Sequence, residues 1–440
     1  MMAGTVSGGL SQALEAQRER LLPCVHCGFC LAACPTYNRL GDENDSPRGR
    51  LDLMAAVVDG RLPATSEAFR THIDRCLGCR ACEPVCPSGV EYGALLELAR
   101  DVATDAVPPA LPTRVLLAVF QGGMLQSLFF FGGRLLRGSG LAWLGARLLP
   151  SVGLLGSAKL GLAMLASSRP WRRLRAVGVG AGSATDEKTA PPARRGRVAL
   201  LTGCVQEGLY QRVNAATVRV LEANGYEVVK VPAQGCCGAL HAHGGALEEA
   251  RGLARVNVSA FGTSDVDWIV ANAAGCGAAM KEYGEMLGTD MSASMADKVR
   301  DVAELLAGDD IRRGAPVPCT VAVDHPCHLI HAQGIRQEPI TVLEAVPGVE
   351  VRIVEKADEC CGGAGIYGIT HPDLGGLIGG DKVAAVERCG ADVLATPNPG
   401  CMMQIGAGLL IDGSNTGVVH PVEILDESYR RAGFYGGAGG

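Results

Sequence analysis

The stretch VEVRIVEKADECCGG, residues 349–363, joins a β-type run to two adjacent cysteines and two glycines. Neighbouring Cα atoms lie about 3.8 Å apart, whereas a disulfide wants its Cα atoms roughly 4.4–6.8 Å apart. Cys360 and Cys361 are therefore poorly placed to bond each other. A chain that keeps both is expected to direct two thiolates at one point.

The same order of β-type run and cysteine occurs twice in the second half of the chain. RVALLTGC, EVVKVPAQGCCG and DWIVANAAGCG are followed by PCTVAVDHPC, VEVRIVEKADECCGG and ADVLATPNPGC. Corresponding cysteines are 123 to 125 residues apart, which indicates an internal duplication. The two sets are Cys204, Cys236, Cys237 and Cys276, and Cys327, Cys360, Cys361 and Cys401.

Helix-type segments separate these runs, so the sequence predicts two α/β domains of βαβ units with parallel sheets. Ligands of such sheets lie beyond the carboxyl ends of the strands, where all these cysteines fall. We expect the thiolates to face iron–sulfur clusters there; the alternative is buried core cysteines. That alternative is preferred for Cys319 and Cys389, which have no counterpart. The flanking histidines are expected to donate hydrogen bonds rather than ligate: His241, His243, His325 and His328.

Two identical C-x2-C-x2-C-x3-C-P runs open the chain, CVHCGFCLAACP from residue 24 and CLGCRACEPVCP from residue 76. This run is typical of two-cluster bacterial ferredoxins, in which the fourth cysteine ligates the other cluster. The predicted [4Fe-4S] ligand sets are therefore Cys24, Cys27, Cys30 and Cys86, and Cys76, Cys79, Cys82 and Cys34. Zinc sites would instead use C-x2-C pairs. The insertion between the runs has helical apolar spacing, so we expect a largely α-helical module.

Length and composition fit this picture. The 440 residues allow two to four domains, and 48% hydrophobic residues with a formal charge of -6 are typical of a soluble globular protein that does not bind nucleic acid. There are 18 cysteines, and the first twenty residues lack the apolar core of a secretory signal. Reduced, metal-binding cysteines in an intracellular compartment are expected.

The central region carries no predicted ligands. Residues 115–133 hold no charge and are flanked by Arg114 and Arg134. We expect helices that pack on partner subunits or lie on a membrane surface, with a core-forming linker and a transmembrane span as alternatives. Residues 178–195 are expected to form a flexible polar linker. The predicted domains are 1–105 (two clusters), 106–195 (apolar helices and linker), 196–310 and 311–440 (cysteine-rich).

The paired cysteines followed by glycine resemble the cysteine-rich domains of heterodisulfide reductases. With two ferredoxin runs in front, the layout is similar to the iron–sulfur subunits of glycolate oxidase, most specifically in CVHCGFCLAACPTYNRLGDENDSPRGR and HIDRCLGCRACEPVCPSGVEY. The fullest form of the cysteine-rich repeat ends in C-x2-C, but here Ala279 and Gln404 occupy the last position. The resemblance thus implies two [4Fe-4S] clusters and one or two further clusters in the repeats.

The resemblance further implies an electron-transfer subunit that is not catalytic when isolated. Its partners would be a flavin-containing subunit that oxidises glycolate or a similar 2-hydroxy acid, and a quinone or membrane electron acceptor. The expected location is cytoplasmic, peripheral on the inner face of the membrane. The alternatives are a disulfide reductase subunit, an iron–sulfur subunit of anaerobic glycerol-3-phosphate dehydrogenase, and a redox-sensing module.

Overall fold

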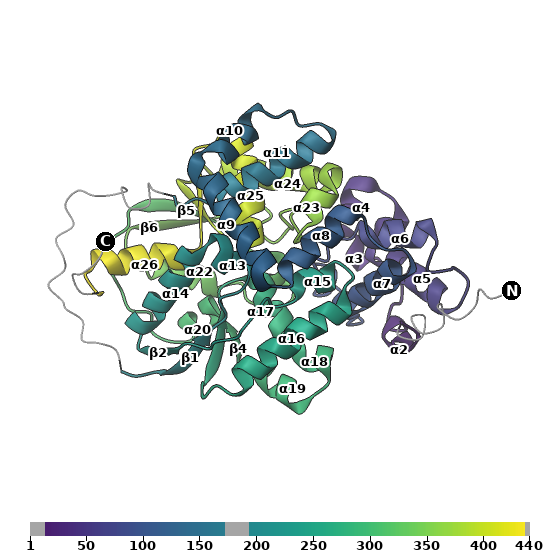
Figure 1. Cartoon of the computed structure of the whole chain (residues 1–440), viewed down its shortest axis with the longest axis horizontal. Coiled ribbons are helices and arrows are strands. Elements are labelled where there is room, and N and C mark those ends of the chain that lie inside the picture. The colour runs from purple at the N-terminus through teal and green to yellow at the C-terminus, as the bar shows by residue number, and fades with distance from the viewer. Residues whose placement is uncertain (1–13, 172–192, 436–440) are drawn as a thin grey trace.

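The computed structural model describes residues 14–171 and 193–435 (Figure 1). The predicted polar linker, residues 178–195, lies almost wholly outside these ranges. The amino-terminal region is helical, as expected. Its helices are α2 (Arg18–Leu21), α3 (Phe29–Ala33), α4 (Pro35–Leu40), η1 (Glu43–Asp45), α5 (Pro47–Val58), α6 (Glu67–Asp74) and α7 (Tyr92–Ala106).

Helix α5 is the longest helix of the insertion between the two cysteine runs. It begins with Ser46, whose side chain accepts a hydrogen bond from the Gly49 N–H at 3.0 Å, and with a proline in the first turn. Leu51, Met54 and Val57 are buried on one side of the helix, against the core of the amino-terminal region. The predicted helical insertion is confirmed, and it separates the cysteine runs without interrupting a common core.

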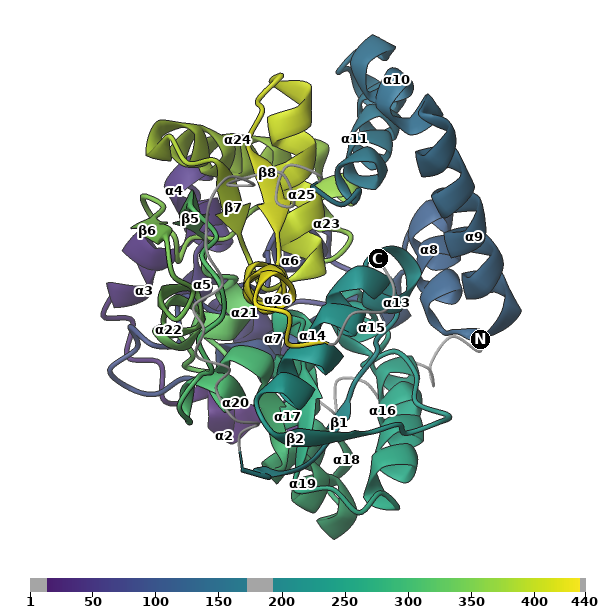
Figure 2. The ribbon, with the colours of Figure 1, turned by 90° about the vertical axis from the view of Figure 1, so that its left-hand side faces the viewer.

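Four apolar helices follow, and Figure 2 shows them along one edge of the molecule. No single helix in the described ranges is long and apolar enough to cross a membrane. Only the first two helices taken together have the length and apolar composition of a membrane span, and the chain bends by 101° between them. The four helices are α8 (Leu111–Phe120), α9 (Gly123–Ser139), α10 (Leu141–Leu148) and α11 (Gly153–Ser167).

The first cysteine-rich repeat is built on a parallel sheet with strand order β2-β1-β3-β4. The strands are β1 (Gly196–Leu200), β2 (Tyr226–Val229), β3 (Trp268–Ala271) and β4 (Val299–Asp301). The helices are α13 (Val205–Leu209), α14 (Gln211–Ala223), α15 (Ala239–His243), α16 (Leu247–Gly262), α17 (Ala274–Lys281), α18 (Tyr283–Leu287), α19 (Asp290–Asp297) and α20 (Val302–Ala307).

The second repeat has the equivalent parallel order, β6-β5-β7-β8, so the duplication seen in the sequence is a duplication of the fold. The strands are β5 (Cys319–Val323), β6 (Val349–Ile353), β7 (Val393–Ala395) and β8 (Gly417–Val419). The helices are α21 (Cys327–Ile330), α22 (Glu338–Glu344), α23 (Tyr367–Thr370), α24 (Pro372–Cys389), α25 (Pro399–Ile411) and α26 (Pro421–Arg431).

The two repeats pack on each other reciprocally. Helix α26 of the second repeat lies on α14 of the first, and α20 of the first lies on α22 of the second. Arg219 pairs with Asp426 through two hydrogen bonds of 2.9 and 2.7 Å across the first of these contacts. One buried apolar core includes strands of both sheets. The two repeats therefore pack into one unit and are not independent domains joined only by a linker.

The amino end of α26 makes this interface sensitive to acid. The buried His420 ring caps the helix, because its Nδ1 accepts a hydrogen bond from the Val422 N–H at 3.1 Å. Burial lowers the pKa of His420 from 6.5 to about 3. The unfolded chain therefore binds a proton here before the folded chain does, and the stability present at pH 7 is lost as the pH falls from 6.5 towards 3.

We predict that His420→Asn removes this acid sensitivity, because asparagine also caps helices but does not titrate. Between pH 7.5 and pH 5.5 the wild type should lose about 1.4 kcal/mol more unfolding free energy than the variant. The equivalent cap Asp301, whose pKa burial raises to about 7, has the opposite pH dependence, so only the difference between the two proteins is informative. Hydrogen exchange of the α26 amides at both pH values measures the loss of unfolding free energy in each protein. Equal losses would contradict the prediction.

Candidate metal centres

The first cysteine run closes around one cavity together with the end of the second run. Cys24, Cys27 and Cys30 line it from one side, and Cys82 and Cys86 from the other. Each run turns its thiols inward through two residues of positive φ: His26 (55°) and Gly28 (85°) in the first, Gly78 (64°) and Arg80 (62°) in the second. Several convergent thiols around one cavity suit an iron–sulfur cluster.

The second group of thiols is more deeply buried. Cys34 of the first run lies with Cys76, Cys79 and Cys82 in the interior. The Cys76 Sγ accepts hydrogen bonds from the Gly78 N–H at 3.4 Å and the Tyr92 hydroxyl at 3.6 Å. Burial alone would raise the pKa of the Cys76 thiol, but the Arg50 and Arg100 guanidinium groups bring it below its ordinary value. This environment favours the thiolate that iron requires.

A fully buried arginine joins the two runs. Arg50 Nη1 lies 4.0 Å from the Cys34 Sγ and donates to the Thr36 hydroxyl at 3.1 Å. Its Nη2 bonds to Asp45 at 3.2 Å. The stretch DENDSPRGR, which carries Asp45 and Arg50, belongs to the resemblance, but its position beside the thiols was not predicted from the sequence. The signal for this position is the mixture of acidic and basic residues between the two cysteine runs.

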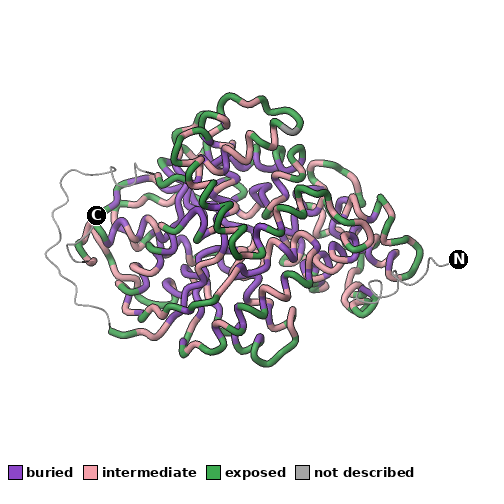
Figure 3. The backbone as a smooth tube through the Cα atoms, viewed as in Figure 1, coloured by how far each residue is buried: buried purple, intermediate pink, exposed green. Residues whose placement is uncertain are grey.

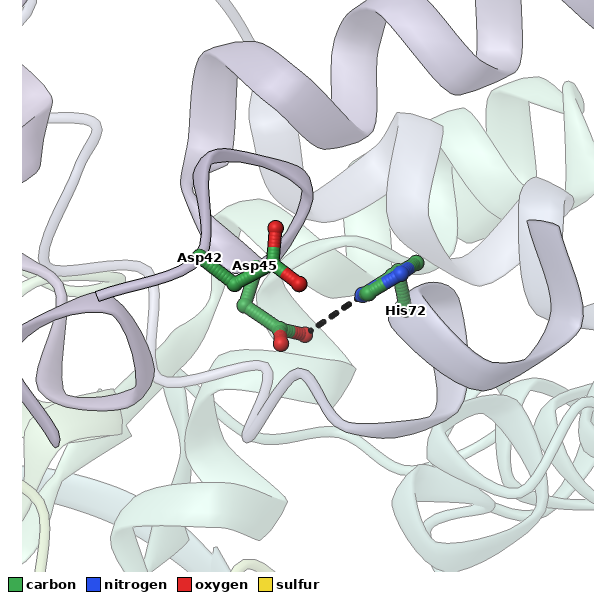
Figure 4. A group of neighbouring side chains, drawn as sticks. All are labelled: Asp42, Asp45 and His72. Atoms are coloured by element: carbon green, nitrogen blue, oxygen red, sulfur yellow. Dashed lines mark hydrogen bonds and ion pairs between the residues drawn. The ribbon is translucent and has the colours of Figure 1, made fainter. Parts of the chain in front are cut away.

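Asp42, Asp45 and His72 also lie close enough together to suggest a cation site (Figure 4). Asp45, however, is already neutralised: His72 Nδ1 lies 3.0 Å from one carboxylate oxygen, and Arg75 bonds to the other at 3.1 Å, in addition to Arg50. Asp42 accepts a hydrogen bond from the Asn44 N–H at the start of η1. The group is a structural ion network that fixes the backbone beside Cys34.

In the first repeat, the loops after β1, β2 and β3 bring the four predicted thiols together at the carboxyl edge of the sheet. Cys204 Sγ lies 3.4 Å from Cys236 Sγ, and Cys237 Sγ lies 3.3 Å from Cys276 Sγ. Buried Asn257 on α16 holds the cysteine loop, since it donates to the Cys236 carbonyl oxygen at 2.9 Å and accepts from the Gly235 N–H at 2.9 Å.

In the second repeat, Cys361 Sγ lies 3.4 Å from Cys401 Sγ, which also accepts a hydrogen bond from the Asn398 amide at 3.3 Å. Cys327 and Cys360 are buried beside them, and His328 Nδ1 lies 3.4 Å from the Cys327 Sγ. Both repeats thus gather four thiols in the same place of the fold. The donor sets suit iron–sulfur clusters, as the spacing in the sequence suggested.

The two repeats differ in the charge beneath the paired cysteines. In the second repeat, Lys382 on α24 pairs with Asp324 at 2.9 Å, and both side chains are at most 2% exposed. Lys382 also donates to the Lys356 and Ala357 carbonyl oxygens at 2.8 and 3.1 Å, in the loop before Cys360. The equivalent positions of the first repeat are Leu201 and Asn257, both uncharged.

Gln404 occupies the position where the fullest repeat has its last cysteine. Its side chain lies against the glycines that follow Cys361: a Cβ added to Gly363 would lie 3.1 Å from Gln404 Cβ, and one added to Gly368 would lie 2.8 Å from its Oε1. The glutamine therefore fills space over the cysteine loop. In the first repeat Ala279 lies in the buried core instead.

The second ferredoxin run abuts the second repeat. Leu77, Cys79, Cys327, Cys360 and Tyr367 belong to one buried apolar cluster. The Tyr367 hydroxyl donates to the Arg75 carbonyl oxygen at 2.8 Å, and His371 Nε2 lies 3.1 Å from the Asp74 carboxylate. Thiols that are 248 positions apart in the sequence are therefore brought to the same interface.

The histidines near the cysteines have different surroundings. His243 Nδ1 lies 3.3 Å from Glu97 of the amino-terminal region, and its ring packs on that of His328 with centroids 4.9 Å apart. His241 Nε2 lies 3.1 Å from the Leu117 carbonyl oxygen, and His325 is buried. Of these four, His328 is the one whose ring nitrogen contacts a thiol.

Cys319 and Cys389 lie away from the clustered thiols. Cys319 begins β5, at the end of the strand opposite to Cys327. Cys389 ends α24, where its carbonyl oxygen accepts a hydrogen bond from Arg352 at 3.1 Å. The position of Cys319 agrees with its interpretation as a core residue, and it serves below as a control position.

Sequence comparisons match both halves of this arrangement. The 4Fe-4S dicluster domain family matches residues 20–90, and the Cysteine-rich domain family matches residues 198–281 and 321–406. The Glycolate oxidase iron-sulfur subunit of Escherichia coli is 36% identical over 433 residues, which cover 96% of this chain and 97% of that protein. The chain belongs to the family of glycolate oxidase iron–sulfur subunits.

Other members and relatives agree with this assignment. A Bacillus subtilis protein named "Probable glycolate oxidase iron-sulfur subunit" is 36% identical over 94% of both chains. A subunit of the Fumarate reductase (CoM/CoB) of Methanothermobacter marburgensis is 31% identical over 53% of this chain and 46% of its own length. The glycolate oxidase family thus shares the whole layout, whereas the latter relative shares about half of the chain.

Proposed function

We propose that the chain relays electrons from a flavin-containing subunit, which oxidises glycolate or a similar 2-hydroxy acid, towards a quinone. The observation that carries the proposal is that Cys79, Cys327 and Cys360 belong to one buried cluster. It brings a ferredoxin-type thiol group and a cysteine-rich one into the same buried part of the protein. Electron transfer between successive clusters needs such short separations.

The chemistry explains why a partner is required. Oxidation of a 2-hydroxy acid removes two electrons and two protons, whereas a [4Fe-4S] cluster accepts electrons singly. A flavin can accept the two electrons together and pass them on one at a time. The family name of the relatives refers to a subunit, which supports the presence of such a partner.

We further propose specific ligand sets. Cys24, Cys27, Cys30 and Cys86 would hold one [4Fe-4S] cluster, and Cys34, Cys76, Cys79 and Cys82 the next. The repeats, proposed as domains of residues 196–310 and 311–440, would add one cluster or two. Their proposed ligands are Cys204, Cys236, Cys237 and Cys276, and Cys327, Cys360, Cys361 and Cys401.

The decisive experiment combines the anaerobically purified chain with the flavin subunit of its complex, glycolate and a water-soluble quinone. We predict no glycolate oxidation by the isolated chain and restored quinone reduction in the mixture. Replacing a proposed ligand in the second repeat, Cys361→Ala, should lower quinone reduction by about 100-fold or more, while glycolate still bleaches the ferredoxin-type absorption. Wild-type iron should be about 12 or about 16 atoms per chain, against about eight for the two ferredoxin runs alone.

The matched control is Cys319→Ala, which removes a buried cysteine of the same repeat at the far end of β5. Its quinone reduction should stay within about twofold of the wild type. Glycolate turnover by the flavin-free chain would overturn the relay assignment. So would efficient reduction of a disulfide substrate by the isolated chain, which would favour a disulfide reductase.

A further inference from the structure

Helices α8 to α11 carry an unusual concentration of exposed apolar side chains. Within the described ranges, 14 of the 24 exposed large apolar side chains lie between residues 111 and 155. Figure 3 draws much of α9, α10 and the turn towards α11 as exposed. Isolated exposed apolar residues are ordinary, but a cluster of this size marks a contact surface.

Six large apolar side chains of α9 are exposed, and four of them form a stripe, with Leu125 and Phe129 beside it. The four, Met124, Leu128, Phe131 and Leu135, recur every three or four residues, so they share one side of the helix. On α10, the next helix, Leu144 and Leu148 are exposed four residues apart and also share one side. These two residues and the four of the α9 stripe are called the apolar face below.

The protein holds the opposite side of α9 in place. Phe130 is buried against Gly208 of α13, and Arg134 and Arg137 donate to the carbonyl oxygens of Gly208 and Leu209, each at 3.0 Å. On α10, the buried Ala142 and Ala146 face inward, and α10 packs on α11. The apolar face is therefore directed outward by fixed contacts and cannot turn into the core by a simple rotation of α9.

The charge of this region is one-sided. The chain has 46 acidic residues against 40 Lys and Arg, yet residues 106–185 contain neither Asp nor Glu. Arg114 on α8 and Arg147 on α10 are exposed, and Lys159 follows on α11. The region thus combines an apolar stripe with cations and contains no anion. A bilayer of anionic lipids is the complementary surface, because it is apolar inside and negatively charged outside.

We propose that the apolar face lies in the interface of an anionic lipid bilayer and attaches the chain to the membrane without spanning it. The bend of 101° between α8 and α9 suits helices that lie along the surface. Trp143, 42% exposed on α10, adds the aromatic side chain that prefers the interface. This deepens the proposed function, because a membrane quinone is dissolved in the same bilayer.

The test is flotation of the purified full chain with vesicles of phosphatidylglycerol and phosphatidylcholine, and with vesicles of phosphatidylcholine alone. We expect strong binding to the anionic vesicles that weakens with added salt. The variant Leu128→Glu, Phe131→Glu, Leu135→Glu should lower the partition coefficient by about 100-fold or more, because three large apolar groups no longer enter the bilayer. A matched control, Met291→Glu, Ile353→Glu, Leu377→Glu, changes three exposed apolar residues elsewhere and should bind as the wild type does.

Trp143 supplies an independent readout. The chain has three tryptophans, so Trp171→Phe and Trp268→Phe leave Trp143 as the single reporter. Its emission should shift to the blue with anionic vesicles and be quenched by brominated lipid. Absence of flotation with the anionic vesicles, or equal flotation of the Glu variant, would overturn the proposal. The proposal would also fail if the wild type were a dimer and the Glu variant a monomer, because the apolar face would then be a contact between two copies of the chain. The relay assay with a water-soluble quinone is independent of this outcome.

Discussion

Cys34→Ala is expected to abolish the same cluster as Cys79→Ala, although Cys34 belongs to the first cysteine run. Cys34 is buried near Arg50 and the thiols of the second run, whereas Cys86 of the second run lines the cavity of Cys24, Cys27 and Cys30. If each proline-terminated run lends its fourth cysteine to the other cluster, each of these two variants should lose about four iron atoms. The electron paramagnetic resonance signal of one and the same reduced cluster should disappear in both.

Cys27→Ala is the matched comparison, because Cys27 lies in the same run as Cys34 and contributes to the other cavity. It should remove the other signal and leave the one that Cys34→Ala abolishes. If the spectra of Cys34→Ala and Cys27→Ala agree with each other instead, each run holds its own cluster and the crossed arrangement is wrong.

Lys382→Asn is expected to cost about 3–5 kcal/mol in the stability of the second repeat, because it leaves the Asp324 carboxylate buried without its cation. Asp324 is 1% exposed, and its remaining side-chain partner is the Thr396 hydroxyl at 2.9 Å. The loop before Cys360 would also lose the two hydrogen bonds that Lys382 donates to it. Native-state hydrogen exchange of the α24 amides measures the loss region by region, which suits a chain of several cooperative units.

The chain itself offers the compensating variant. Asp324→Leu, Lys382→Asn and Thr396→Ala together copy the uncharged residues of the first repeat: Leu201, Asn257 and Ala271. Because a buried ion pair can be replaced by matched uncharged groups at little cost, this triple variant should recover most of the stability that Lys382→Asn loses. A triple variant less stable than the single one would mean that the ion pair itself stabilises the repeat.

The α/β fold could be predicted because its signals are local. β-type runs followed by cysteine, separated by helix-type segments, recur at a nearly constant spacing and indicate a duplicated parallel sheet. The fourth strand of each sheet was missed. Strands β4 and β8 are three residues long and are not followed by a cysteine, so they stand outside the repeated pattern that indicates the other strands.

The central region shows the limit of such signals. Its apolar composition allowed partner contact, a membrane surface, a core linker or a span. In the structure, Phe130 and Leu117 are buried while Leu128 and Phe131 are exposed. Composition alone does not distinguish these neighbours, because burial depends on which helix face meets the first repeat.

The sequence by itself predicted the thiols that we propose as metal ligands and the groups they form, since ligand spacing and strand period are properties of a few neighbouring residues. Only the tertiary structure decided that Cys79 lies beside Cys327, that Arg50 is buried next to Cys34, and that Lys382 pairs with Asp324. These contacts join residues that are distant along the chain. Their geometry follows from packing whole elements against each other, which no local pattern encodes.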